Sequence, residues 1–156
     1  MSSRITDLIE PLLGHEARAP RLLHGSNLAI DFGRPNEPFV GPVLQGEWHL
    51  WIAMAAWRIE RSEGVVAGSE DPRPVLEPAV GMIGGRRLTG VDIRMPSLET
   101  AFDFDGLRLL VFPVHSRRDV PDPAEHWLLR TPAGDVVTAG PGSEWSIDKA
   151  NTGGWH

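Results

Sequence analysis

The segment Pro113 to His126, PVHSRRDVPDPAEH, gathers residue types that can do chemistry. It contains two histidines, His115 and His126, and several carboxylates, among them Asp119. Histidine and carboxylate side chains can bind a divalent metal, or can act as a general base with an orienting acid. Their spacing matches no recognised metal-ligand motif. The segment is therefore consistent with a metal-assisted or acid/base hydrolase, and also with a solvated polar loop.

Contact with a partner molecule is a third interpretation of the same segment. Arg117 and Arg118 carry adjacent guanidinium groups, which bind carboxylates and phosphates through paired hydrogen bonds. Loops that are held by a rigid scaffold often carry binding residues. We therefore rank partner binding above catalysis, and the sequence assigns no catalytic residue, no metal ligand and no cofactor.

A second candidate surface is the aromatic cluster Trp48, His49, Trp51 and Trp57. Residues alternate between the two faces of a strand, so Trp48 and Trp51 are expected on opposite faces. Exposed tryptophan is enriched at binding hot spots. We expect Trp48 and Trp57 in the core and keep Trp51 as a candidate contact. The candidate partner-binding residues are thus Trp51, His115, Arg117, Arg118, Asp119 and His126.

The two glycine-rich runs do not predict phosphate binding. Gly81 to Arg87 lacks the Lys-Ser/Thr ending of a P-loop, and Gly140 to Trp145 is not followed by a helical pattern. The sequence also contains neither a Gly-x-Ser-x-Gly motif nor a His-Glu-x-x-His motif. Turns explain both glycine runs.

The elements that would position these residues are written twice in the chain. The pattern WRIERSEGVVAG, Trp57 to Gly68, returns seventy positions later as WLLRTPAGDVVTA, Trp127 to Ala139. Ordered matches of this kind predict tandem repeats at about residues 22–70 and 86–141. Two further landmarks match in the same order, Leu23 to Gly25 with Leu88 to Gly90 and Gly46 with Gly106.

Each repeat has the pattern of antiparallel strands joined by tight turns. Apolar residues alternate with polar ones, as in Leu28, Ile30 and Phe32 around Ala29 and Asp31. Turn signals of the kind found in hairpins separate the runs. They stand at Glu63-Gly64, Asp105-Gly106 and Ala133-Gly134.

The predicted fold is all-β with a short N-terminal helix at about residues 5–14, in a single domain that spans 1–156. Two antiparallel β-meander repeats would each bury one apolar face by stacking, as a sandwich or a barrel with a pseudo-twofold axis. Three other segments are predicted as irregular. Arg18 to Arg21 is a linker, Ser69 to Pro78 with its prolines connects the repeats, and residues 149–156 after the Gly140 to Gly142 stop form a mobile tail.

Composition narrows the class of partner. The chain of 156 residues has a formal net charge of -6, so it repels phosphate backbones and anionic membrane surfaces. It has no cysteine, which excludes disulfides, thiolate metal sites and cysteine nucleophiles. No stretch approaches the roughly 20 apolar residues that a transmembrane helix needs. We expect a cytoplasmic protein that binds neither nucleic acid nor membranes.

The second repeat carries a resemblance to known proteins. Its segments GGRRLTGVDI, LETAFDFDGLRLLVF and EHWLLRTPAGDVVTAGPGSEW resemble those of small bacterial β-rich proteins, some of which are similar to immunity proteins that neutralise secreted toxins. The resemblance covers roughly the last 75 residues. It implies protein binding and carries no catalytic residue over to this chain.

The sequence thus predicts a non-enzymatic cytoplasmic protein-binding module, of the immunity type, whose acidic surface favours a basic partner protein. The alternative is a metal-assisted or acid/base hydrolase that uses the loop from His115 to His126. A third alternative is a barrel that binds an apolar ligand in its interior. The sequence does not decide the oligomeric state.

Overall fold

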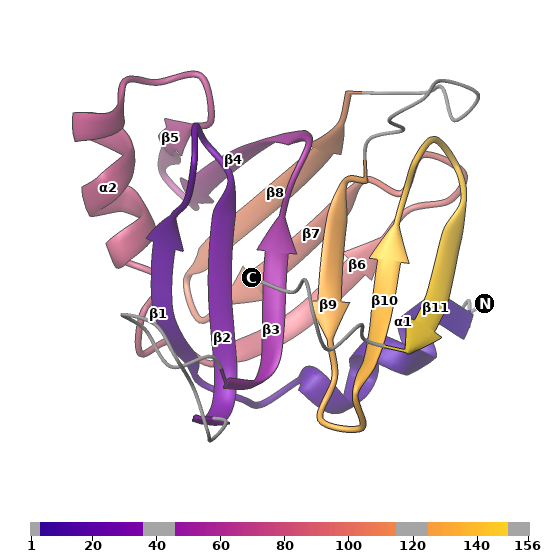
Figure 1. Cartoon of the computed structure of the whole chain (residues 1–156). Helices are drawn as coiled ribbons and strands as arrows, with labels where there is room; N and C mark the ends of the chain where they lie inside the picture. The colour runs from indigo at the N-terminus through magenta and orange to yellow at the C-terminus, as the bar shows by residue number, and fades with distance from the viewer. Residues whose placement is uncertain (1–3, 36–45, 115–124, 150–156) are drawn as a thin grey trace.

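Eleven strands, two short α-helices and one 3₁₀ turn make up the computed structural model, which describes residues 4–35, 46–114 and 125–149. The strands form two antiparallel sheets that lie one behind the other (Figure 1). Over the described residues the sheets remain separate and do not close into a barrel, so the predicted barrel alternative is wrong. The mainly β architecture with an N-terminal helix is as predicted.

The first sheet has six strands in the order β1-β2-β3-β9-β10-β11. It joins the two ends of the chain, because β3 pairs antiparallel with β9. Its strands are β1 (Ala17–Leu22), β2 (Leu28–Pro35), β3 (Gly46–Ile52), β9 (Trp127–Arg130), β10 (Asp135–Ala139) and β11 (Trp145–Lys149).

The second sheet has five strands in the order β5-β4-β8-β7-β6. It is built from the middle of the chain, and its central contact is the antiparallel pairing of β4 with β8. Its strands are β4 (Ala55–Arg61), β5 (Gly64–Gly68), β6 (Leu88–Ile93), β7 (Thr100–Phe104) and β8 (Leu107–Pro113). The three predicted tight turns are confirmed, since they join β4 to β5, β7 to β8 and β9 to β10.

One hydrophobic core fills the space between the sheets. The residues that alternate inward along the strands are buried, including Trp48 and Trp57 as expected. Phe32 on β2 stacks on Phe104 on β7, with ring centroids 6.3 Å apart and an interplanar angle of 8°. Burial of this large apolar area is the main stabilising term for the fold.

The helices are short and lie at opposite sides of the molecule. The predicted N-terminal helix is confirmed as α1 (Arg4–Ile9), which continues as the 3₁₀ turn η1 (Glu10–Leu12). Pro11 has no backbone N–H, which favours this tighter ending. Neither α-helix of the described chain has the length and apolar content that a membrane crossing needs.

The predicted connection Ser69 to Pro78 is wrong in part, because α2 (Arg73–Gly81) is a helix. Pro72 stands at its N-cap and another proline lies in the first turn, where a missing N–H costs nothing. The buried residues of the helix then anchor it against β1 and β5. Pro78 lies inside the helix and is tolerated there because this apolar face is packed.

Two strands were also missed by the sequence analysis. The predicted linker Arg18 to Arg21 is part of β1, whose regular pattern is hidden by a bulge at Ala19, with φ 50°, and by Pro20. β11 follows the predicted stop at Gly140 to Gly142 and pairs along its whole length with β10. The predicted mobile tail lies outside the described residues, except for Lys149, which ends β11.

The two sheets are joined at one corner by a short antiparallel contact between residues 14–17 and 85–88. Glu16 and Arg87 face each other in an isolated bridge. Four backbone hydrogen bonds of 2.8 to 3.0 Å surround them. They run from Ala17 N to Arg86 O, from Leu88 N to His15 O, from Gly85 N to Ala17 O and from Gly14 N to Leu88 O.

Candidate functional site

The chain passes between the two sheets twice, and both passages lie at the same end of the molecule. Ala53 and Met54 lead from β3 to β4, and the segment after Val114 leads from β8 back to β9. The passages are tied together by backbone hydrogen bonds of 3.0 Å from Ala53 N to His126 O and from Met54 N to Glu125 O. This end is therefore fixed where the predicted long loop begins and ends.

A hollow of about 530 Å³ opens beside these passages. Met54 is 49% exposed and Val114 59% exposed, which is unusual for large apolar side chains in such proximity. A volume of this size is typical of binding clefts. Its lining consists of the apolar residues Ala53, Met54, Ala55, Ala56 and Val114 and the polar residues Ser26, Asn27, Ser69 and Glu70.

A second hollow of about 250 Å³ continues the first across the outer face of the second sheet. The two share Ala56, Ser69 and Glu70, so together they form one surface, which we call the crossover groove. The second hollow is further lined by Trp57, Arg58, Gly68, Asp71 and Phe112.

The charge at the crossover groove is negative. Glu70 and Asp71 are exposed at its rim, and Asp71 Oδ2 also accepts a hydrogen bond of 2.9 Å from Gly68 N. The guanidinium of Arg58 lies 3.1 Å from Glu60 Oε2 and stacks over the Phe112 ring at 5.0 Å. Because the positive charge of Arg58 is compensated in this way, the acidic rim sets the local potential.

His126, a predicted contact residue, is fully buried in the structure. Its backbone N donates to Ala139 O at 2.8 Å, and its ring Nε2 lies 3.0 Å from Gly142 O. A Cβ on Gly140 would lie only 2.8 Å from the ring. In this position the imidazole supports the turn that follows β10 and offers no surface to a partner.

Trp51 is half-buried on the outer face of the first sheet, where Ala29 and Leu128 are its neighbours on β2 and β9. This agrees with the expectation that it points away from the core. The structure does not bring it together with His126. The other predicted contact residues, His115, Arg117, Arg118 and Asp119, lie outside the described residues.

The sequence analysis missed a buried polar cluster on the same outer face. Asp31 on β2 and His49 on β3 are direct cross-strand partners and both are fully buried. Asp31 Oδ1 lies 2.7 Å from His49 Nδ1, and Asp31 Oδ2 lies 2.6 Å from an Arg21 guanidinium nitrogen. Alternation in the sequence placed Asp31 and His49 on one face, but their pairing depends on how β2 and β3 are aligned.

The cluster also holds the first residue of β3. Gly46 N donates to Asp31 Oδ1 at 3.0 Å, and Arg130 donates to Gly46 O at 3.1 Å. A Cβ at Gly46 would lie 2.4 Å from the Phe32 carbonyl oxygen, so only glycine fits. The cluster therefore fixes the alignment of β2 and β3.

Electrostatics within the cluster favour the ionised carboxylate. Burial alone would raise the pKa of Asp31, but hydrogen bonds from His49, Gly46 and Arg21, with the charge of His49, lower it overall. Burial lowers the pKa of Arg130, and the Asp31 charge opposes that shift. A charged group with this many hydrogen bonds is stable in a buried site.

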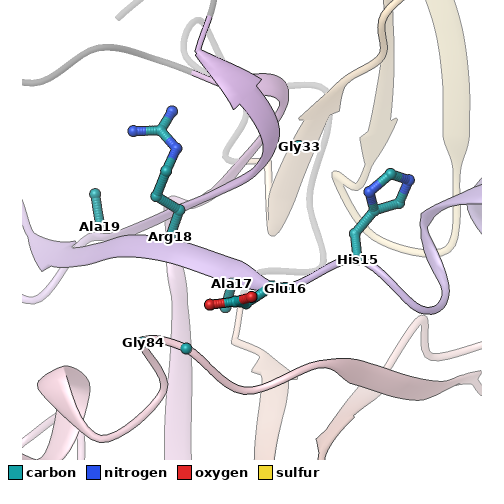
Figure 2. Close-up of a pocket in the computed structure, with 8 residues that line it drawn as sticks. His15, Glu16, Ala17, Arg18, Ala19, Gly33 and Gly84 are labelled. Atoms are coloured by element: carbon teal, nitrogen blue, oxygen red, sulfur yellow. The ribbon is translucent and has the colours of Figure 1, made fainter.

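A third hollow of about 440 Å³ lies between β1 and the turn at Gly84 and Gly85. Figure 2 shows His15 and Arg18 projecting to one side of the β1 ribbon, whereas Glu16 lies on the side of Gly84. The three groups do not converge on one point. The hollow therefore lacks the arrangement of an acid, a base and a substrate position that catalysis needs.

Comparison with known proteins adds no identity, since no family model, no curated protein and no solved structure matches the chain. Within the described ranges, no three His, Asp or Glu side chains are grouped so that they could hold a metal ion. The crossover groove is thus the site on which a function can be argued from shape, exposure and charge.

Proposed function

We propose that this protein is a non-enzymatic protein-binding module whose contact surface is the crossover groove. The observation that carries the proposal is the exposure of Met54 and Val114 beside a hollow of about 530 Å³. Apolar side chains in such a place gain free energy when a partner removes them from water. Small hollows at the centre of an interface are where binding energy concentrates.

The partner is a basic protein. The chain has a net charge of -6, and Glu70 and Asp71 extend this negative charge to the rim of the groove. Opposite charge speeds the association of two proteins, and the effect weakens as salt increases. An immunity-type protein that captures a basic toxin domain in the cytoplasm would have these properties, as the resemblance of the second repeat implies.

Site-specific photo-crosslinking in the native cells tests the proposal. A photoreactive amino acid is placed at Met54, at Val114 or, as a control, at Val65, which is 63% exposed on β5 and does not line the groove. We expect one basic protein to be cross-linked from positions 54 and 114 and not from 65. Equal cross-linking from all three positions would contradict the proposal, as would none from any.

We also infer that the scaffold consists of two tandem repeats related by a pseudo-twofold axis. Support comes from strand pairing, because β3 pairs with β9 just as β8 pairs with β4. Trp127 faces Ile52 across the first pair, and Trp57 faces Val111 across the second. We call residues that occupy matching places in this way twin positions.

The closest contacts between the repeats support the same inference. Phe32 and Phe104 occupy twin positions at an offset of 72 residues, and they stack on each other. Glu16 and Arg87 are 71 residues apart and face each other. The four hydrogen bonds around them form two pairs that are exchanged by the same offset of 71. A twofold axis produces contacts between like positions.

The two indole groups are bonded alike. Trp57 Nε1 donates to Ser26 O at 2.7 Å, whereas Trp127 Nε1 donates at 3.1 Å to the hydroxyl of Thr100, which donates to Leu98 O at 2.9 Å. Leu98 is the twin of Ser26 at the offset of 72. The predicted landmark at Leu23 to Gly25 does not fit this alignment, because that segment follows β1 whereas Leu88 begins β6.

The alternative of a hydrolase receives no specific support from the described residues. His126 is buried against Gly140 and Gly142, so it is not available to a substrate in this structure. The other member of the predicted pair, His115, lies outside the described residues. The hydrolase remains a prediction from the sequence.

A further inference from the structure

Ala56 and His126 occupy twin positions, and the space beside them is filled in one repeat and open in the other. Each residue directly precedes a tryptophan of the repeat, Trp57 or Trp127, and therefore points to the outer face of its sheet. In the second repeat the His126 ring occupies this space. In the first repeat the side chain is only a methyl group.

The filled site shows what the space accepts. The imidazole of His126 is planar and carries a nitrogen that lies 3.0 Å from the backbone oxygen of Gly142. It packs so closely on the turn after β10 that Gly140 has no room for a Cβ. A flat ring with an N–H group therefore suits a site at this place in the scaffold.

The open site differs from the filled one in its charge. The hollow of about 250 Å³ beside Ala56 has Glu70 and Asp71 at its rim, whereas the residues at the same offset of 70 are Gly140 and Pro141. The second repeat has no carboxylate at these two places. A group that enters the open site thus meets negative charge that a neutral ring would not use.

We infer that the crossover groove binds a partner segment that inserts a planar basic side chain, arginine or histidine, over Ala56. The inserted group takes the place that His126 takes in the second repeat, and its charge faces Glu70 and Asp71. Apolar neighbours of the inserted residue cover Met54 and Val114, which line the adjoining hollow. This inference rests on the proposed function and adds the chemistry of the segment that is recognised.

Selection from a random linear peptide display library tests the inference on the full chain. We expect the enriched peptides to share an arginine or a histidine next to apolar residues. Two variants probe the site, Ala56→His, which fills the open space with the ring of the twin position, and Glu70→Arg, which reverses the charge of the rim. Glu10→Arg is the matched control, because Glu10 is exposed and does not line the groove.

Both groove variants should bind the enriched peptide about tenfold more weakly than the wild type, and Glu10→Arg should bind it equally well. Folding of each variant is checked by its thermal unfolding. Enriched peptides without a basic residue would overturn the inference, as would unchanged binding to both groove variants. If Met54→Asp alone abolishes binding, the proposed function stands and this inference fails. If no peptide is enriched, both fail.

Discussion

Phe32 and Phe104 stack on each other in the middle of the core, with ring centroids 6.3 Å apart and planes only 8° from parallel. They come from β2 and β7, which belong to different sheets and different repeats. The contact joins the two halves of the chain at the place where the pseudo-twofold axis would pass. It is the point from which the stability of the scaffold can be tested.

Replacement of either phenylalanine by alanine should destabilise the protein by a similar amount, about 3–5 kcal/mol. The reason is that both rings are fully buried and occupy equivalent surroundings. Urea unfolding of both single variants and of the double variant measures this. We expect the double variant to lose less than the sum, because each single change already breaks the shared contact. Strictly additive losses would contradict the account.

Thr100→Val should reduce the free energy of unfolding by about 1–3 kcal/mol. The variant keeps the shape of the side chain but removes the hydroxyl that accepts from Trp127 and donates to Leu98. Thr138→Val is the control, since Thr138 is half-exposed on β10. Urea unfolding of the two variants gives the comparison, and equal losses would show that the bridging hydroxyl contributes nothing.

Gly140→Ala should destabilise the protein more than Gly134→Ala. Both glycines have a positive φ, 92° and 87°, so both variants bear the cost of a left-handed alanine. Only at Gly140 does the new Cβ meet another group, the ring of His126 at 2.8 Å. Thermal unfolding measures the difference. In a His126→Ala background the extra cost of Gly140→Ala should disappear, and its persistence would assign the strain elsewhere.

The Asp31 carboxylate should stabilise the fold above acidic pH. Its pKa is lower in the folded state than its ordinary value of 3.8, so the stability is fully present above that value and is lost as the pH falls through the lower folded pKa. Asp31→Asn should therefore reduce the free energy of unfolding by about 2–3 kcal/mol at neutral pH and by less in strong acid. Urea unfolding at both pH values measures this.

The matched control for that experiment is Asp148→Asn, which changes an exposed carboxylate on β11 of the same sheet. It should have little effect at either pH. A loss for Asp31→Asn that is the same at neutral and acidic pH would show that shape, and not charge, is what the cluster requires.

Much of the fold could be predicted because alternation and turn residues are local signals. Asp105 and Gly106 identify a hairpin turn without knowledge of the rest of the chain. The missed elements lack such signals. Pro20 disguises β1 as a linker, and the prolines of α2 are read as breakers although Pro72 precedes the helix. Only packing against β1 and β5 shows that this segment is helical.

The candidate site could be predicted only in outline. The sequence singled out the segment from Pro113 to His126, and the crossover groove does lie where this segment leaves β8. The groove itself is formed by residues such as Met54, Ala56 and Glu70, which are far apart in the sequence and have no motif. Their proximity depends on the pairing of β4 with β8, a long-range contact that no local pattern specifies.

The most direct measurement of the central claim is the dissociation constant of the cross-linked partner, once purified, for the wild type, Met54→Asp and Val65→Asp. Both variants place a carboxylate on an exposed apolar position, but only Met54 lies in the crossover groove. The account predicts binding about tenfold weaker or more for Met54→Asp, or about 1.4 kcal/mol, and unchanged binding for Val65→Asp. Equal affinities for all three proteins would contradict it.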